Sequence, residues 1–306
     1  MKDLRNRIAG ALYGVAIGDA LGAPLEFMSR DEIARKHGRV TEMIGGGWLN
    51  VAPGEITDDT QMTLAVAEGI IENPDDPIQE IGVRFIKWAK SGPKDIGGTC
   101  SMSIHSAATI SHQDAPNKEE WFEASKYTSE ASGSRSGGNG ALMRTVYPGL
   151  YYEGQLQAVE TAGAIAQMTH WDKKSTEACY LYTEMVHSII EANNDDGAWW
   201  HVNRVLEGSE YRLQPRKDIE PTGYVVDSFK CALHSLAVTE TLEGAIIEAV
   251  NLGGDADTIA AITGGLAGAI YGYNEIPQRW IQTLNQETRA QLDRLVDAAV
   301  KNREEE

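Results

Sequence analysis

The chain has 306 residues, enough for one large domain or two small ones. It carries 27 lysine and arginine residues against 45 aspartate and glutamate residues, which gives a formal net charge of −18. A field of that sign repels phosphate backbones and anionic lipid headgroups, so it excludes a general role in binding nucleic acid or a membrane surface. We therefore expect a partner that is small, cationic or held through metal.

Cysteine usage and hydropathy indicate the compartment. Cys100, Cys179 and Cys231 lie far apart and form no paired spacing, which is typical of a reducing environment. Residues 1–10 mix charges with few apolar residues and lack the apolar core of a signal peptide. The longest nearly apolar run, residues 259–271, is shorter than the roughly 20 residues that a membrane helix needs. We expect a cytoplasmic monomer without membrane insertion.

Apolar residues recur at three- and four-residue steps along most of the chain, which is the spacing of one helix face. No alternation of strands and helices appears, and no low-complexity linker marks a boundary. The pattern predicts an all-helical fold in a single domain spanning residues 1–306. In chain order, the predicted helices cover residues 4–21, 61–72, 77–90, 155–168, 176–192, 225–238, 242–250, 258–271 and 287–301.

Two of these segments carry glycine at every fourth position: Gly10, Gly14, Gly18 and Gly22 in the first, and Gly264, Gly268 and Gly272 in the eighth. Each glycine inside a helix costs about 1 kcal/mol relative to alanine, so something should compensate. Close approach of the two backbones is the physical candidate, and ordinary small-residue packing is the alternative. If the stripes meet, Asp19 and Glu26 come close to the start of the eighth segment, which carries Asp255 and Asp257.

The residues before the second predicted helix, Thr57-Asp58-Asp59-Thr60, form an acidic cluster. Threonine and aspartate are preferred helix caps, so a structural cap explains part of the pattern. Only one side chain can be that cap, however. Adjacent aspartates on a first turn point about 100° apart, because an α-helix has 3.6 residues per turn. They could therefore serve two different cations.

A second cluster, Gly253-Gly254-Asp255-Ala256-Asp257-Thr258, again places two carboxylates and a threonine at a helix start. Its spacing fits neither a haloacid dehalogenase-type phosphatase nor an EF-hand, which needs an oxygen ligand where Ile259 stands. Together the two clusters offer the hard oxygen ligands that Mg²⁺ or Mn²⁺ prefers, whereas without metal their charges would repel. We predict two divalent cations held by Thr57, Asp58, Asp59, Asp255, Asp257 and Thr258.

A glycine-rich segment, Ser136-Gly137-Gly138-Asn139-Gly140, precedes Arg144. Consecutive backbone N–H groups in such a loop can form an anion-binding nest, and the arginine could add donors. The segment matches neither the Walker phosphate loop, because the Gly-Lys-Ser/Thr ending is missing, nor the dinucleotide-binding pattern. A simple turn is the competing interpretation.

Taken together, the motifs resemble those of the ADP-ribosylglycohydrolase family, in particular its bacterial branch that reactivates dinitrogenase reductase. The resemblance runs from about residue 5 to residue 285. The matching segments, in family order, are Gly18-Asp19-Ala20-Leu21-Gly22 with Glu26, Thr57-Asp58-Asp59-Thr60, Asp95-Ile96-Gly97, the loop 136–140 with Met143-Arg144, Thr169-His170, and the segment 253–258.

This resemblance implies an orthogonal helical bundle around a dinuclear magnesium or manganese centre that cleaves the N-glycosidic bond between ADP-ribose and a modified side chain. The two acidic motifs match the family's metal ligands. Asp95 and Glu26 become the candidates for orienting the ribose or moving a proton. The loop of Ser136, Gly137, Gly138, Asn139 and Gly140 matches the diphosphate loop, and His170 and Tyr224 match ring contacts to the ligand.

Physical chemistry favours arginine as the modified side chain. Cleavage builds positive charge at the anomeric carbon, which an acidic pocket accommodates. A guanidinium is flat and cationic, so it should enter such a cleft and stack on a ring, with Tyr224 and Trp171 as the available faces. We expect ADP-ribosylated proteins or small ADP-ribosyl molecules as partners. The alternatives are an ADP-ribosyl-serine or other O-linked hydrolase, a non-catalytic ADP-ribose-binding module, and a metal phosphohydrolase.

Overall fold

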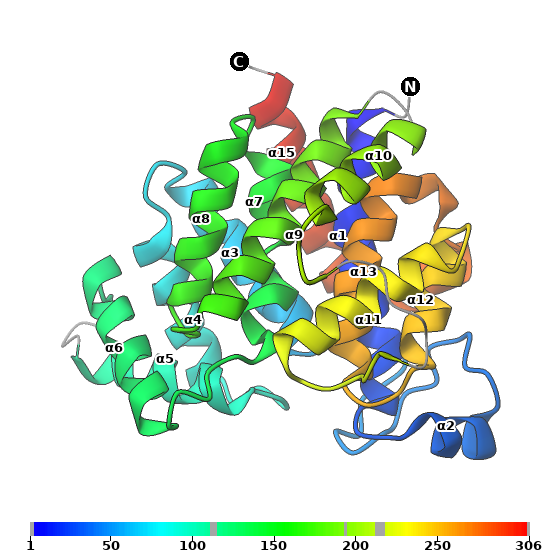
Figure 1. The fold of residues 1–306 in the computed structure, drawn as a ribbon, viewed down its shortest axis with the longest axis horizontal. Coiled ribbons are helices and arrows are strands. Elements are labelled where there is room, and N and C mark those ends of the chain that lie inside the picture. The colour runs from blue at the N-terminus through cyan, green and yellow to red at the C-terminus, as the bar shows by residue number, and fades with distance from the viewer. Residues whose placement is uncertain (1–2, 111–114, 193–194, 212–217, 305–306) are drawn as a thin grey trace.

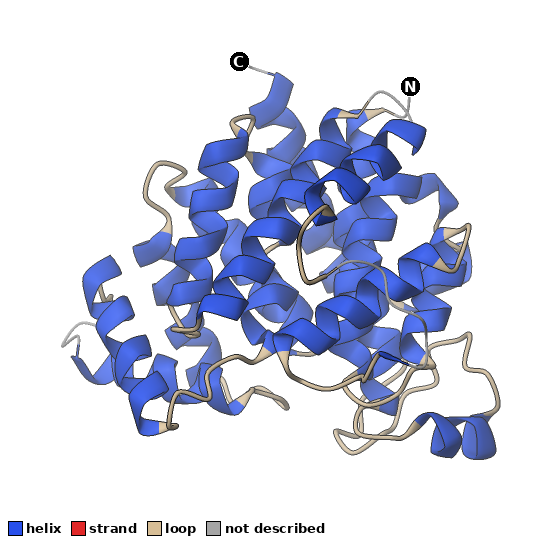
Figure 2. Ribbon diagram, in the orientation of Figure 1, coloured by secondary structure: helices blue, strands red, loops and turns tan. Residues whose placement is uncertain are grey.

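The computed structural model describes residues 3–110, 115–192, 195–211 and 218–304, and within them all regular structure is helical (Figures 1 and 2). Those residues hold no β-strand, only three isolated bridges between loops. The prediction of an all-helical fold is therefore confirmed. The helices are α1 Leu4–Gly22, α2 Arg30–His37, α3 Asp58–Glu72, α4 Ile78–Lys90, α5 Gly98–Ile110, α6 Lys118–Ala131, α7 Val146–Tyr151, α8 Gln155–Gln167, α9 Lys173–Glu191, α10 Asp195–Leu206, α11 Val225–Ala237, α12 Leu242–Val250, α13 Ala256–Tyr271, α14 Gln278–Thr283 and α15 Gln286–Glu304, with short 3-10 turns at Ala23–Leu25, Asn139–Arg144 and Tyr273–Glu275.

The two glycine-striped helices, α1 and α13, lie side by side and antiparallel at the centre of the molecule (Figure 1). A Cβ atom built on Gly14 would lie 2.0 Å from the carbonyl oxygen of Gly264, and one built on Gly10 would lie 2.2 Å from that of Gly268. These distances exclude any side chain at either position. The stripes therefore meet, as the glycine spacing predicted, although Gly18 faces Ala260 and not a glycine.

This pairing sets where the acidic residues lie. In the antiparallel register the C-terminal end of α1 reaches the N-terminal end of α13, and a Cβ on Gly22 would lie 2.3 Å from the Cα of Asp257. Glu26, four residues beyond Gly22, consequently comes within reach of Asp255 and Asp257. The close approach of α1 and α13 thus serves a shared site as well as packing.

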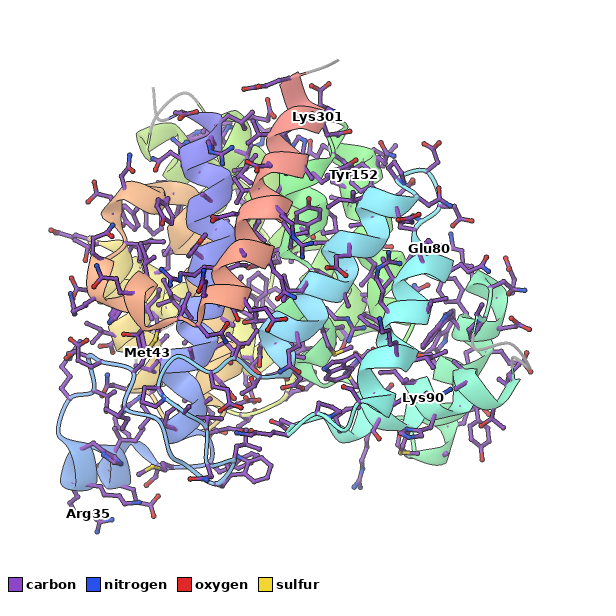
Figure 3. All side chains as sticks on the ribbon, turned by 180° about the vertical axis from the view of Figure 1, so that it is seen from behind. Arg35, Met43, Glu80, Lys90, Tyr152 and Lys301 are labelled. Atoms are coloured by element: carbon purple, nitrogen blue, oxygen red, sulfur yellow. The ribbon has the colours of Figure 1, made fainter. Side chains whose placement is uncertain are left out.

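One stretch of the described chain, Leu4–Leu25, is long and apolar enough to cross a membrane by length and composition alone. Its most apolar window has a mean hydropathy of 1.4 and is completely buried inside the structure. Besides α13, helix α15 packs along α1, as the view from behind shows (Figure 3). The stretch therefore occupies the position of a core helix in a globular protein.

The predicted helices are all present, with shifted boundaries. Helix α3 begins at Asp58, three residues before the predicted start, so both aspartates of the first cluster belong to its first turn. Helix α9 begins at Lys173, also three residues early. The prediction omitted α2, α5, α6, α7, α10 and α14. Most of these lie on the surface or are short: α2, for example, buries only Ile33 and therefore shows little apolar periodicity.

Loops from distant parts of the chain meet at one end of the bundle, the lower end in Figure 1. Two of the isolated bridges fix them there, because Ser29 pairs with Gly253 and Gly138 pairs with Tyr224. The first bridge joins the chain after α1 to the loop before α13, and the second joins the glycine-rich segment to the start of α11. The acidic clusters and the glycine-rich loop are thereby gathered at the same end.

Candidate metal and ligand site

Asp19 organises the first acidic cluster from inside helix α1. Its buried carboxylate accepts hydrogen bonds from the backbone N–H of Thr57 at 3.0 Å and of Thr60 at 3.1 Å, and from both threonine hydroxyls at 2.8 and 2.5 Å. Burial raises the pKa of Asp19 to about 6, and these hydrogen bonds oppose the rise. The N-terminus of α3 is thus capped from another helix, and no side chain of its own caps it. The carboxylates of Asp58 and Asp59 are therefore not used to cap the helix.

Asp58 and Asp59 both line a cleft of about 370 Å³. Oδ2 of Asp59 accepts a long hydrogen bond, 3.4 Å, from the hydroxyl of Thr258. Its other oxygen, Oδ1, is buried without a hydrogen-bond partner. Burial, reinforced by neighbouring carboxylates, raises the pKa of both groups well above the usual range. An unpartnered buried carboxylate oxygen carries a large desolvation cost, which a cation at this point would offset.

The second cluster reaches the cleft because a tight turn precedes helix α13. Gly253 and Gly254 have φ of +76° and +65°, and a Cβ on Gly254 would lie 1.8 Å from the carbonyl oxygen of Pro221. The turn directs Asp255 and, on the first turn of the helix, Asp257 into the cleft. Burial and the charge of Asp59 raise the pKa of Asp257 well above the usual range.

Glu26 completes this group. One ligand atom each from Glu26, Asp255 and Asp257 lies within 4.8 Å of the others, which is the arrangement of a cation site. Burial, followed by repulsion from Asp95 and Asp255, raises the pKa of Glu26 to about 8, although the indole N–H of Trp48 donates to its Oε2 at 2.6 Å. The structure therefore brings Glu26 together with Asp255 and Asp257.

Asp95 lines the same cleft from the connection between α4 and α5. It is only partly buried, and burial is the main cause that raises its pKa above the usual range. Its neighbour Lys94 ties this connection to the loop before α3, through an ion pair with Glu55 at 2.7 Å and a hydrogen bond to the carbonyl oxygen of Asn50 at 3.3 Å. Asp95 is thus held in the cleft lining, close enough to Glu26 and Asp58 to raise the pKa of both.

The glycine-rich segment forms another part of the wall. Gly138, Asn139 and Gly140 line the cleft, and the side-chain amide of Asn139 donates to Oδ2 of Asp255 at 2.7 Å. The backbone N–H of Asn139 is already bonded to Gly223, at 3.1 Å, so it is not available to an anion.

Ser136, which the sequence predicts to bind the ligand, does not line the cleft. Its hydroxyl is completely buried, 2.9 Å from the hydroxyl of Ser129 and 3.2 Å from the carbonyl oxygen of Trp171, so it anchors the loop. Tyr224 lies beside the loop, where a Cβ on Gly137 would be 3.1 Å from its ring, and it is 46% exposed. Neither Tyr224 nor Thr57 belongs to the cleft lining.

Arg144 supports the loop as well and does not add donors to it. The buried guanidinium donates to the carbonyl oxygens of Gly140 at 2.8 Å and Ile165 at 3.1 Å, and to the hydroxyl of Thr169 at 2.7 Å. That hydroxyl lies 2.8 Å from Nδ1 of His170. Burial lowers the pKa of His170 to about 3, so the ring is neutral, and its Nε2 lies beside the glycine-rich loop.

Trp171 is not an available ring face for a ligand in the cleft. Its ring packs against Phe122 with centroids 5.6 Å apart, and the ammonium of Lys126 lies 4.3 Å from its centroid. The aromatic side chains that do line the cleft are Phe27 and Trp48, which the sequence analysis overlooked. The run Gly45-Gly46-Gly47 before Trp48 was the available signal, because consecutive glycines mark a turn that can present an aromatic side chain.

The chain is similar to known proteins over its whole length. The family model of the ADP-ribosylglycohydrolases matches residues 1–306. The ADP-ribosyl-[dinitrogen reductase] glycohydrolase of Rhodospirillum rubrum is 35% identical over 297 residues, covering 96% of each chain. The ADP-ribosylarginine hydrolase Tri1 of Serratia proteamaculans (strain 568) is 32% identical over 292 residues, covering 93% of this chain and 76% of the relative.

A solved structure described as an ADP-ribosylglycohydrolase-related protein complex superposes with a TM-score of 0.78 at 29% identity, covering 98% of this chain and 100% of the other. The fold, the convergence of the acidic motifs and these matches lead to one conclusion. This chain belongs to the ADP-ribosylglycohydrolase family.

Proposed function

We propose that this protein hydrolyses the N-glycosidic bond between ADP-ribose and the side chain of arginine, and so reverses mono-ADP-ribosylation. The observation that carries the proposal is the convergence of Glu26, Asp58, Asp59, Asp255 and Asp257 in one cleft beside the glycine-rich loop. The names of the two relatives support it, because one is an ADP-ribosyl-[dinitrogen reductase] glycohydrolase and the other an ADP-ribosylarginine hydrolase.

The donor set fits two divalent cations, Mg²⁺ or Mn²⁺. All of its side-chain donors are hard oxygens, and the unpartnered Oδ1 of Asp59 is suited to a cation. When bound, such ions supply Lewis acidity that activates water and polarises substrate oxygens. The residues that would hold them are Asp58, Asp59, Asp255, Asp257 and Thr258, together with Glu26. The predicted ligand Thr57 does not line the cleft, and its hydroxyl donates to Asp19.

The cleft's own side chains suit the charge changes of the reaction. As the bond at the anomeric carbon breaks, positive charge develops on the ribose, and the surrounding carboxylates stabilise it. Asp95 is the group in the lining best placed to move a proton, because it is only half-buried and its raised pKa lies closer to neutrality. Asn139 holds Asp255 in place through its amide.

The glycine-rich loop is the proposed diphosphate site. Gly138 and Gly140 present backbone to the cleft, and Nε2 of His170 lies close to both. A neutral imidazole at this position can be a hydrogen-bond partner of a ligand held on the loop. Tyr224, half-exposed beside Gly137, would offer its ring to the adenosine end of the ligand.

A cytoplasmic monomer is the expected state of the protein. The three cysteines are buried free thiols, which agrees with a reducing compartment. Light scattering on the purified protein tests the oligomeric state.

The proposed activity can be tested on peptides ADP-ribosylated at arginine, serine or cysteine, incubated with Mg²⁺ or Mn²⁺. We expect free ADP-ribose to be released from the arginine peptide, and release to stop in excess chelator. Release of inorganic phosphate would instead indicate a phosphohydrolase, and preference for the serine peptide an O-linked hydrolase. Binding of ADP-ribose without turnover of any peptide would indicate a non-catalytic module.

A further inference from the structure

Two large aromatic side chains stand exposed at the acidic end of the cleft. Phe27 is 70% exposed and Trp48 is 56% exposed, and both line the cleft. Their ring centroids are 5.5 Å apart with an interplanar angle of 43°. Such rings contribute little to the core, so their contact with each other at the rim of a cleft indicates a binding surface.

Trp48 is held rigidly at the tip of a short hairpin. Gly46 and Val51 exchange two backbone hydrogen bonds, at 2.7 and 3.0 Å, around this tip. The hairpin packs on the chain after α1, since a Cβ on Gly47 would lie 2.8 Å from the Cα of Pro24. The indole N–H then donates to Glu26 at 2.6 Å. The ring face is therefore oriented before any ligand arrives, which limits the entropy lost on binding.

Phe27 occupies a backbone conformation that favours glycine. Its φ is +63°, and two backbone hydrogen bonds fix it there, from Phe27 to Gly254 at 2.7 Å and from Gly254 to Met28 at 2.8 Å. A bulky residue with positive φ is strained, and such strain persists where the surroundings enforce it, commonly at ligand sites. The backbone thereby holds an exposed ring at the cleft, which Asp255 also lines.

The contacts give an order of features across the cleft. Asn139 of the glycine-rich loop bonds Asp255, Asp255 lies within 4.8 Å of Glu26, and Glu26 bonds Trp48. The carboxylates thus lie between the glycine-rich loop and the aromatic pair. With the diphosphate of ADP-ribose on the loop and the anomeric carbon at the carboxylates, the departing group points to the rings.

We propose that Phe27 and Trp48 form the subsite for the leaving group and select a flat cation, the guanidinium of arginine, over a hydroxyl-bearing side chain. The inference rests on the proposed function. Aromatic faces attract cations, and a guanidinium also stacks flat on them, whereas a serine hydroxyl offers neither interaction.

Steady-state kinetics on ADP-ribosyl-agmatine, a guanidinium substrate, tests the subsite. Phe27→Leu and Trp48→Leu should each raise KM about tenfold and change kcat much less, because stacking contributes equally to the ground and transition states. Trp48→Phe keeps a ring face without the N–H, so its KM should rise much less than that of Trp48→Leu. Trp200→Leu is the matched control, since Trp200 is 55% exposed on α10, outside the cleft lining, and should leave both constants unchanged.

Binding measurements separate this inference from the proposed function. In the metal- and ADP-ribose-loaded protein, agmatine should bind more tightly than putrescine, an ammonium of similar length, and both leucine variants should abolish the difference. Their affinity for ADP-ribose should match that of the wild type. If the wild type does not cleave the arginine linkage, the proposed function fails, and agmatine binding still decides on the subsite. If the two leucine variants lose as much affinity for ADP-ribose as for agmatine, the rings contact the nucleotide. If the variants bind agmatine as the wild type does, the rings contact neither the nucleotide nor the leaving group. Either result overturns the subsite.

Discussion

Asp19 shows how one buried carboxylate can position a cluster of others. Four hydrogen bonds from Thr57 and Thr60 converge on it, two from backbone and two from hydroxyls. Because Asp19 caps α3, the two aspartates that follow are not consumed as caps. Mutation of a group that holds a metal ligand in place typically lowers the affinity for the metal by about 10- to 100-fold.

Asp19→Asn should therefore weaken Mn²⁺ binding about 10- to 100-fold. An amide replaces one accepting oxygen by an NH₂ group, which would face the N–H and hydroxyl donors it ought to satisfy. Titration calorimetry measures the affinity, and circular dichroism checks that the helices are retained. Asp31→Asn, on the exposed helix α2, is the control and should bind Mn²⁺ normally. An unchanged affinity in Asp19→Asn would show that the capping bonds do not position the site.

Asp257→Asn tests the ligand set directly. The substitution removes one negative charge from the first turn of α13 while keeping the side chain's shape. We expect turnover of the arginine-linked substrate to fall by about 100-fold or more, a loss typical of removing an electrostatic or metal-site group. Full activity of this variant in excess chelator would contradict a two-metal site.

At the scale of elements, the pairing of α1 and α13 determines the site. Interior glycines lower helix propensity, yet they allow the two backbones to approach until a Cβ has no room. The same register then brings the end of α1 to the start of α13, where Asp257 lies. Packing and ligand placement are therefore consequences of one helix contact.

Gly18→Leu should lower the free energy of unfolding by about 3 kcal/mol or prevent folding. Even a Cβ at this position would lie 2.1 Å from the carbonyl oxygen of Ala260, so the leucine must push the helices apart. Gly154→Leu is the matched control, since a Cβ there meets only Gln157 at 3.8 Å. Chemical denaturation measures both variants. Equal midpoints for Gly18→Leu and the wild type would contradict the close contact.

The helices that were overlooked show the limit of apolar periodicity. Helices α2 and α6 have few buried residues for their length, but each begins with a capping box, Ser29 with Glu32 and Asn117 with Glu120. That signal is present in the sequence and would have located both helices. Helix α3 began earlier than predicted because its cap comes from Asp19, 38 residues away from Thr57, which no local pattern contains.

At the scale of the whole molecule, the crowded carboxylates oppose folding when no cation is bound. Burial raises the pKa of Asp19 from 3.8 to about 6 and that of Glu26 from 4.5 to about 8, and the pKa values of Asp58, Asp59 and Asp257 are also raised. Between the unfolded and folded values the native state binds more protons than the unfolded state. The native state is therefore most stable, with respect to these groups, at low pH, where they are protonated. It loses that stability as the pH rises through their folded pKa values.

In chelator, the thermal midpoint should consequently fall between about pH 7.5 and 8.5. His170 and His187, whose pKa values are lowered, contribute little in this window, because unfolded histidine is largely deprotonated there. Saturating Mn²⁺ should raise the midpoint by about 5 °C at pH 8, if its concentration is about 100 times Kd. Scanning calorimetry with and without Mn²⁺ measures both effects, and Glu26→Gln should flatten the pH dependence in chelator. A midpoint in chelator that rises with pH would contradict this account.

The sequence by itself determined the helical class and predicted the chemistry of the site. Apolar spacing reflects which face of a helix is buried, and the oxygen-rich clusters at two helix starts limit the ligands that can bind, so both are visible locally. The four-residue glycine spacing even predicted the contact between α1 and α13. The glycines are visible in the sequence, and the reason for them is the backbone of a helix far away in the chain.

Only the tertiary structure decided which side chains share the cleft. It placed Glu26 with Asp255 and Asp257, turned the hydroxyl of Ser136 away, and set Phe27 and Trp48 at the rim. These outcomes depend on loops that are fixed by hydrogen bonds to distant residues, such as the bond between Phe27 and Gly254. Contacts of that separation are set by the packing of the whole chain, so no window of sequence could have shown them.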